Sequence, residues 1–194
     1  MRVVVVENVT LDGVMQAPAR PDEDPRDGFA HGGWAVGYGD AVMAQKMGER
    51  MAREGAMLLG RRTYEDFYCV WPKRTDNPYT DVLNRTQKYV ASRTLTEPLP
   101  WENSTLLSGD ATDAVARLRE QPGGGDLAVL GSGTLVRALA ARGLVDEYLL
   151  SIHPLVLGSG RRLFEHGLPP ARFTLADAVP TTTGVIIATY QPTA

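Results

Sequence analysis

Three short segments carry residue types that bind phosphate, and each directly follows a run of apolar residues. They are "GRRT" at 60–63, "SRT" at 92–94 and "GSGTL" at 131–135. Glycine allows a tight turn, N–H groups at a helix start attract anions, and guanidinium groups match phosphate oxygens in pairs. The three segments therefore predict a phosphate-binding site built from turns that lie far apart in the sequence.

The elements that hold these turns follow from the hydrophobic pattern. The apolar runs do not alternate with polar residues, which is typical of strands covered on both faces; they lie at 3–6, 56–60, 88–92 and 127–131. Helical patterns lie between them, at 40–54, 112–121 and 134–142. This alternation predicts an α/β fold with three α/β/α layers and a mostly parallel central sheet. The carboxyl ends of parallel strands share one edge, so we expect the three turns to converge there.

The C-terminal part of the chain has a different pattern. Segments 148–158, 172–179 and 184–192 are strand-like and have no helical pattern between them. They predict antiparallel strands at one edge of the sheet. With 194 residues, the whole chain 1–194 is expected to form a single domain.

Composition excludes several classes of protein. The net charge of -3 gives no field for nucleic acid or an anionic membrane, so neither is an expected partner. One cysteine and three scattered histidines do not make a zinc site, and no metal is expected. The apolar N-terminal run is too short to span a membrane, so we expect a cytoplasmic protein.

The glycine turn at 131–135 and the arginines suggest separate tasks. Gly131 and Gly133 permit close approach of the backbone, and the helix start after them offers N–H groups to a pyrophosphate. Arg61 and Arg93 could hold a separate phosphate. A third glycine of the common dinucleotide fingerprint would fall at Val136, and no Gly-Lys-Ser/Thr motif occurs. We therefore expect a different dinucleotide site, in which arginines select a 2′-phosphate and favour NADPH over NADH.

Other side chains have two interpretations each. Asp12 is the best candidate for a catalytic acid, or else an ordinary turn aspartate. Trp34 and Trp71 are candidates for the walls of a substrate pocket, or for core or interface packing, and Met47 for substrate contact or core packing. The long segment 16–39 is expected to form a lid, a pocket wall or a subunit contact.

A family resemblance now emerges from motifs in order along the chain. The sequence resembles the dihydrofolate reductase-like superfamily, and more closely its stand-alone bacterial members related to the C-terminal reductase domain of the bifunctional deaminase-reductase of riboflavin biosynthesis. The resemblance covers essentially the whole chain and is carried by "VTLDGVM", "LLGRRTYEDF", "YVASRTL", "LAVLGSGTLVRAL" and "GLVDEYLLSIHPLVLGSGRRLF".

The resemblance implies that NADPH is the cofactor and assigns a part of it to each turn. Arg61 would contact the 2′-phosphate side, the residues after it the pyrophosphate side, and Ser92 and Arg93 the adenosine phosphate. The loop with Thr10 and Asp12 would close over the nicotinamide. The implied cofactor-binding residues are Thr10, Gly60, Arg61, Arg62, Thr63, Ser92, Arg93, Gly131, Ser132, Gly133, Thr134 and Leu135.

The activity that the resemblance implies is hydride transfer from NADPH to a small planar heterocycle. The nearest named activity is reduction of 5-amino-6-(5-phosphoribosylamino)uracil in riboflavin biosynthesis. Dihydrofolate or pterin reduction is an alternative, although Met43, Met47 and Met51 occupy the helix stripe where dihydrofolate reductases carry an acidic residue. A second alternative is an NADPH-binding sensor or scaffold without catalysis. A homodimer built on the late strands is also expected.

Overall fold

The structure is a computed structural model that describes residues 1–121, 124–165 and 168–193. The chain forms two compact units, one of Met1–Val4 with Arg50–Val145 and the other of Val5–Glu49 with Asp146–Ala194. The strands are β1 (Arg2–Thr10), β2 (Gly55–Gly60), β3 (Gln87–Ala91), β4 (Ser104–Leu106), β5 (Asp126–Leu130), β6 (Glu147–His153), β7 (Phe173–Pro180) and β8 (Ile186–Pro192). The α-helices are α1 (Ala41–Met51), α2 (Arg61–Val70), α3 (Thr80–Arg85), α4 (Ala111–Glu120) and α5 (Gly133–Ala141), with short 3-10 turns η1 (Arg26–Gly28) and η2 (Trp71–Lys73).

The strands form an eight-stranded sheet in the order β4-β3-β2-β5-β1-β6-β8-β7. β2 pairs in parallel with β3 and with β5, and β3 in parallel with β4. β8 pairs antiparallel with β6 and with β7. The prediction of a mostly parallel sheet with antiparallel C-terminal strands is therefore confirmed, while the prediction of a single domain remains a prediction.

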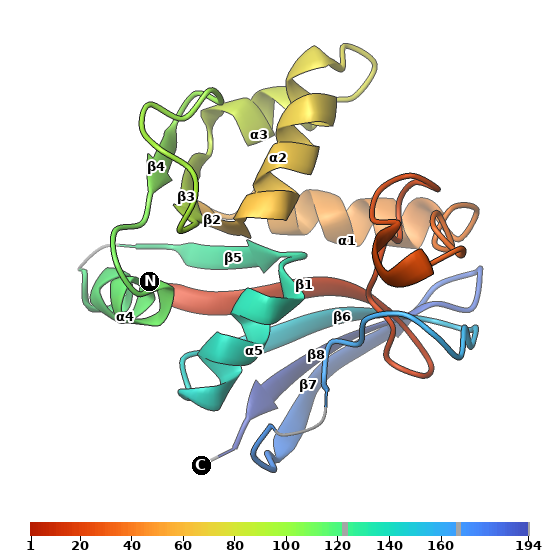
Figure 1. The fold of residues 1–194 in the computed structure, drawn as a ribbon. Coiled ribbons are helices and arrows are strands. Elements are labelled where there is room, and N and C mark those ends of the chain that lie inside the picture. Colours follow the sequence, from red (N-terminus) through yellow and green to blue (C-terminus); the bar gives the residue numbers. More distant parts are fainter. Residues whose placement is uncertain (122–123, 166–167, 194) are drawn as a thin grey trace. The chain divides into compact units, whose positions relative to one another are not determined.

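In the first unit, the buried strand β2 sets the position of its neighbours (Figure 1). Gly60 lies opposite Ala91 of β3, and Leu58 lies opposite Val129 of β5. The three strands therefore end at the same edge, where α2 and α5 begin. A hydrophobic core lies against these strands and contains Met57, Leu59, Tyr64, Leu83, Val90 and Trp101.

A buried lysine on β3, Lys88, binds the C-terminal end of helix α3, although the sequence pattern did not single it out. The Nζ atom of Lys88 donates hydrogen bonds to the carbonyl oxygens of Leu83 at 2.8 Å, Asn84 at 3.1 Å and Thr86 at 2.7 Å. It also lies 4.5 Å from the ring centroid of Trp101. Burial lowers the pKa of Lys88 to about 8. These contacts satisfy carbonyl groups at the C-terminus of α3 that have no partner inside the helix.

In the second unit, β8 lies between β6 and β7 and pairs antiparallel with both. β6 ends at His153, earlier than the predicted segment 148–158, because Pro154 follows it and has no N–H group to donate to a strand ladder. Asp40 caps helix α1: its Oδ1 atom accepts a 2.8 Å hydrogen bond from the N–H of Met43. Its Oδ2 atom accepts bonds from the N–H and hydroxyl of Thr182.

The long segment before α1 packs within the second unit. Val14, Ala17, Phe29 and Trp34 form a buried cluster, and the Nε1 atom of Trp34 donates a 2.7 Å hydrogen bond to the carbonyl oxygen of Gln16. Phe29 and Trp34 thus pack within the same unit. A lid, pocket wall or subunit contact formed by this segment remains a prediction. No helix in the described part of the chain is long and apolar enough to cross a membrane.

Candidate dinucleotide site in the first unit

The turns after β2 and β5 are joined by one serine. The hydroxyl oxygen of Ser132 accepts a 2.8 Å hydrogen bond from the N–H of Gly60. It lies 3.0 Å from Thr63 Oγ1 and 3.0 Å from the carbonyl oxygen of Leu130. Two of the three segments that the sequence singled out are therefore in direct contact, although more than 65 residues separate them in the sequence.

The backbone at Gly131 and Ser132 has an unusual conformation. Their φ angles are +54° and +62°, a left-handed region that side chains disfavour. A Cβ atom on Gly131 would lie 2.9 Å from Thr63 Oγ1 and 3.1 Å from Thr63 Cγ2. A side chain at position 131 would therefore clash with Thr63 and strain the backbone, so glycine suits this close contact between the two turns.

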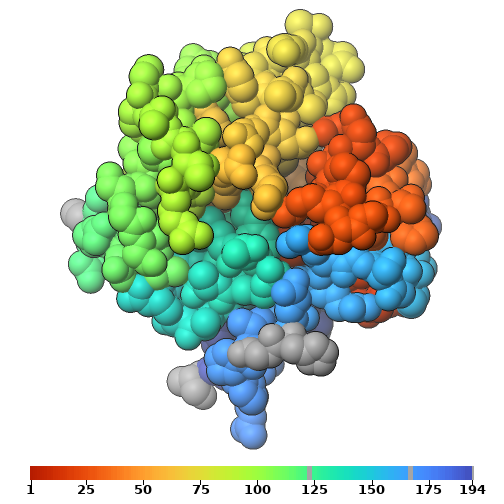
Figure 2. All heavy atoms as spheres, viewed as in Figure 1, coloured from red at the N-terminus to blue at the C-terminus, as the bar shows by residue number. Residues whose placement is uncertain are grey.

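Helices α2 and α5 both start at this edge without a capping side chain in the part of the chain that the structure describes. The N-cap of α2 is Gly60, and that of α5 is Ser132 in the left-handed conformation. N–H groups of the first helical turn have no partner inside the helix and carry the positive end of the helix dipole. Two such ends, tied together through Ser132, suit a ligand with two linked phosphates. Figure 2 shows atoms of the α2 region in amber and of the α5 region in teal at the surface.

The third segment follows β3, beside the start of α2. The register of β2 and β3 places Ser92 and Arg93 next after Ala91, the partner of Gly60. The hydroxyl of Ser92 accepts hydrogen bonds from the N–H groups of Thr94 at 3.1 Å and Leu95 at 3.0 Å, which close a tight turn. Arg93 is exposed at this turn. The expected convergence of the three turns is thus present within the first unit.

The arginines of this edge differ in their contacts. Arg61 forms an ion pair with Glu65, and the Nη1 to Oε2 distance is 3.2 Å. Arg62 and Arg93 are exposed and have no ion pair within residues 1–121, 124–165 and 168–193. Three arginines therefore belong to the turns at this edge, and one of them, Arg61, is paired with a carboxylate.

Asp12 lies in the second unit and is held by four groups. Its carboxylate accepts hydrogen bonds from Thr10 Oγ1 at 2.6 Å and from the N–H groups of Leu157 and Gly158, and it forms a 3.3 Å ion pair with Arg162. The bond from Thr10, aided by the two N–H groups, lowers the pKa of Asp12 to about 2. The carboxylate is therefore ionised at neutral pH and joins two loops. Its catalytic role remains a prediction, as does cofactor contact by Thr10.

A second carboxyl group, which sequence reasoning missed, has the opposite character. Glu7 on β1 is buried, and its Oε1 atom has no hydrogen-bond partner among the described residues. Burial raises the pKa of Glu7 well above its usual value, and the neighbouring charge of Glu23 adds to this effect. Glu7 therefore keeps its proton to higher pH than an ordinary glutamate. Its signal in the sequence was a single charge after a run of four valines.

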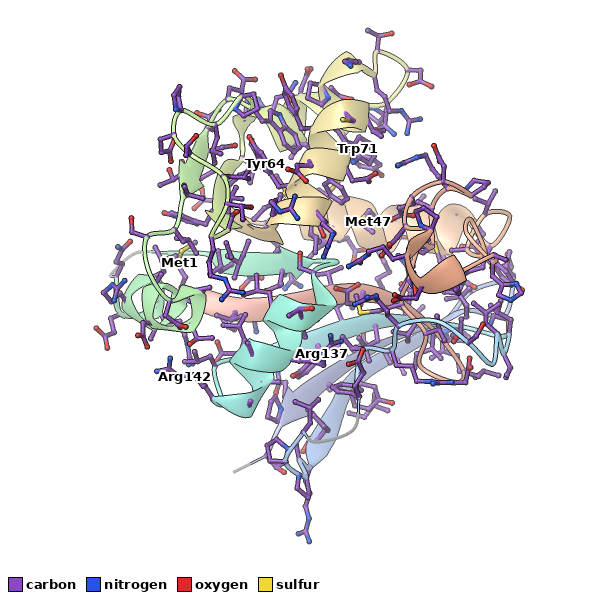
Figure 3. All side chains as sticks on the ribbon, viewed as in Figure 1. Met1, Met47, Tyr64, Trp71, Arg137 and Arg142 are labelled. Atoms are coloured by element: carbon purple, nitrogen blue, oxygen red, sulfur yellow. The ribbon has the colours of Figure 1, made fainter. Side chains whose placement is uncertain are left out.

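The three residues predicted to line a substrate pocket have different surroundings. Trp34 is buried in the cluster of the second unit described above. Met47 on α1 is 40% exposed. Trp71 packs on the edge of the first unit's core, next to Phe67, with the Arg74 guanidinium 5.3 Å from its ring centroid (Figure 3). Their role in substrate binding remains a prediction. Across the described residues, no three His, Cys, Asp or Glu side chains lie together as a metal site.

Comparison with known proteins adds to this geometry. The model of the RibD C-terminal domain family matches residues 2–187. A putative riboflavin biosynthesis protein from Shewanella sp. PV-4 has a similar fold, with a TM-score of 0.69, 21% identity and full coverage of both chains. A pyrimidine reductase-like protein from Corynebacterium diphtheriae gives a TM-score of 0.65 at 14% identity, over 100% of this chain and 92% of that one.

Two further proteins are similar to this chain, one in fold and one in sequence. Dihydrofolate reductase from Enterococcus faecalis, solved in complex with NADP(H), gives a TM-score of 0.60 at 11% identity, over 100% of this chain and 97% of that one. The uncharacterized protein YyaP of Bacillus subtilis is 35% identical over 114 residues, which span 56% of this chain and only 58% of YyaP. The fold is thus that of dihydrofolate reductase-like proteins. With a match over nearly its whole length, the chain belongs to the RibD C-terminal domain family.

Proposed function

We propose that the chain is an NADPH-dependent reductase that transfers hydride to a small planar heterocycle. The family and the pyrimidine reductase-like neighbour support a reductase of the riboflavin-pathway type. The observation that carries the proposal is the tie of Ser132 to Gly60 and Thr63, which brings two uncapped helix N-termini to one edge.

The residues of this edge fit a dinucleotide phosphate chain. Gly131 allows the turn after β5 to pack closely against Thr63, and the N–H groups of α2 and α5 supply donors without charge. Arg61, Arg62 and Arg93 add cations that match an additional phosphate. A solved dihydrofolate reductase of similar fold carries NADP(H), which supports this choice of cofactor.

The chemistry divides between the cofactor and the protein. NADPH, when bound, supplies the hydride, and the chain's own groups bind it and orient it. Asp12 is ionised at neutral pH and has no proton to give, whereas Glu7 holds its proton more tightly than usual. For the substrate we propose a pyrimidine of the 5-amino-6-(5-phosphoribosylamino)uracil type.

Binding and turnover together test this function. The protein is titrated with NADPH and with NADH, following the fluorescence of the reduced nicotinamide, and then supplied with pyrimidine, pterin and quinone acceptors. We expect micromolar binding of NADPH, weaker binding of NADH, and oxidation of NADPH by a pyrimidine acceptor. Binding without turnover on any acceptor would indicate a sensor instead, and absence of binding would refute the proposal.

We also propose that the chain forms a homodimer through the late strands of its second unit. β7 is at the end of the strand order, and all but one of its residues are exposed. Large apolar side chains are exposed here, among them Phe173 at 38% and Leu175 at 51% on β7 and Ile186 at 45% on β8. A long apolar edge strand left open invites pairing with another chain. Light scattering should give twice 21.1 kDa, and Leu175→Lys should give the mass of one chain.

A further inference from the structure

Arg61, the predicted contact of the 2′-phosphate, already has an anionic partner in its own helix. Its Nη1 atom lies 3.2 Å from Oε2 and 3.5 Å from Oε1 of Glu65, one helical turn further along α2. The side chains are 38% and 45% exposed. Both groups therefore reach solvent, and packing does not confine either of them to this contact.

The position of Arg61 makes this pair weak and easy to exchange. Arg61 is the first residue of α2, where the positive end of the helix dipole repels a cation, and Arg62 adds a second positive charge. An arginine four residues before a glutamate is also the less favourable order of the two charges on a helix. Glu65 relieves part of this conflict, and an incoming phosphate group would relieve more of it.

We propose that Glu65 is a specificity-determining residue, whose carboxylate competes with the 2′-phosphate of the dinucleotide for Arg61. This inference rests on the proposed function. A phosphate monoester carries up to two charges and three oxygens, so it displaces the single carboxylate from Arg61. NADH has no phosphate at this position and leaves the pair intact. Glu65 thus limits the preference for NADPH and speeds the release of NADP⁺.

The expected effect of removing the competitor follows from the strength of exposed ion pairs. Glu65→Gln keeps the length of the side chain and removes its charge. Since exposed pairs contribute little, NADPH should bind about two- to fivefold more tightly to this variant, and NADP⁺ should dissociate more slowly by a similar factor. The affinity for NADH should stay the same.

Two comparisons separate this role from general charge effects. Glu120→Gln is the matched control, because Glu120 is an exposed glutamate at the end of α4 and the same charge is removed. In an Arg61→Ala background, Glu65→Gln should no longer tighten NADPH, because the group for which the carboxylate competes is gone.

The test is a titration with NADPH and NADH of wild type, Glu65→Gln, Glu120→Gln, Arg61→Ala and the double variant Arg61→Ala/Glu65→Gln. Stopped-flow dissociation of NADP⁺ is measured for the same proteins. Tighter NADPH binding for Glu65→Gln alone, lost in the Arg61→Ala background, supports the inference. The inference is overturned, while the proposed function stands, if wild type binds NADPH and Glu65→Gln has the same NADPH affinity. It is also overturned if Glu65→Gln raises the affinity for NADPH and NADH equally. If wild type binds neither dinucleotide, the proposed function fails, and this inference fails with it.

Discussion

The N–H group of Gly60, at the end of β2, donates a 2.8 Å hydrogen bond to the hydroxyl oxygen of Ser132, at the start of α5. This contact fixes the distance between the two helix N-termini that we assign to the dinucleotide phosphates. A single side chain thus connects turns whose phosphate-binding character was visible in the sequence only separately.

Ser132→Ala should therefore weaken cofactor binding more than it weakens the fold. The variant loses the hydrogen bond from the Gly60 N–H and the contact with Thr63 Oγ1. We expect NADPH affinity to fall by about 1–2 kcal/mol because the two turns are no longer held together. Isothermal calorimetry measures this loss, and thermal melting measures the fold. An unchanged affinity would show that the tie does not organise the site.

Gly131→Ala should damage the same edge through a steric clash. The new Cβ atom would lie 2.9 Å from Thr63 Oγ1, and the φ angle is +54°. Gly109→Ala is the matched control, because Gly109 has a φ of +76° but nothing within 4 Å of a new Cβ. Conformation alone should cost each variant about 1 kcal/mol. Only Gly131→Ala should also lose NADPH binding; equal behaviour of the two variants in denaturation and binding would argue against the clash.

Asp12→Asn tests whether Asp12 is a structural or a catalytic residue. The substitution removes the ion pair with Arg162 and weakens the bonds from Leu157 and Gly158. We expect a loss of about 1–2 kcal/mol in unfolding free energy, measured in urea at pH 7, with the pH profile of turnover unchanged. A variant of normal stability that loses an ionisation from the pH profile of turnover would make Asp12 catalytic.

The buried imidazole of His153 should make the second unit sensitive to acid. Burial lowers its pKa from 6.5 to about 4, and its Nδ1 atom has no partner among the described residues. Since the unfolded chain takes up the proton first, stability should fall as the pH drops from 6.5 towards 4, by about 3 kcal/mol at most. Urea unfolding at pH 7 and pH 5 should show this slope in wild type and a smaller one in His153→Gln. The same slope in both would assign the acid sensitivity to other groups.

Much of the fold could be predicted because the buried strands are long apolar runs. β2, β3 and β5 lie within one or two residues of their predicted positions, and the antiparallel character of β7 and β8 followed from the lack of helices between them. β4 was not foreseen, since its three residues carry no pattern. The two compact units were also not foreseen, because the sequence has no linker between them.

The residue types of the candidate site could be predicted from the sequence, but the hydrogen bonds that join its turns could not. Glycines and arginines after apolar runs indicated phosphate binding, because glycine lets the backbone approach a ligand and guanidinium groups match phosphate oxygens. The hydroxyl of Ser132 could not be assigned to Gly60 without the strand register. The ionised state of Asp12 depends on Leu157 and Gly158, whose proximity is a tertiary property.

Binding of a phosphorylated dinucleotide at this edge should depend on Arg61. NADPH and NADH affinities are compared in wild type, in Arg61→Ala, and in Arg85→Ala as an exposed arginine elsewhere in the first unit. We expect Arg61→Ala to weaken NADPH binding by about 1.5–3 kcal/mol and NADH binding much less, while Arg85→Ala changes neither. Equal losses for both dinucleotides in Arg61→Ala, or no loss for either, would contradict it.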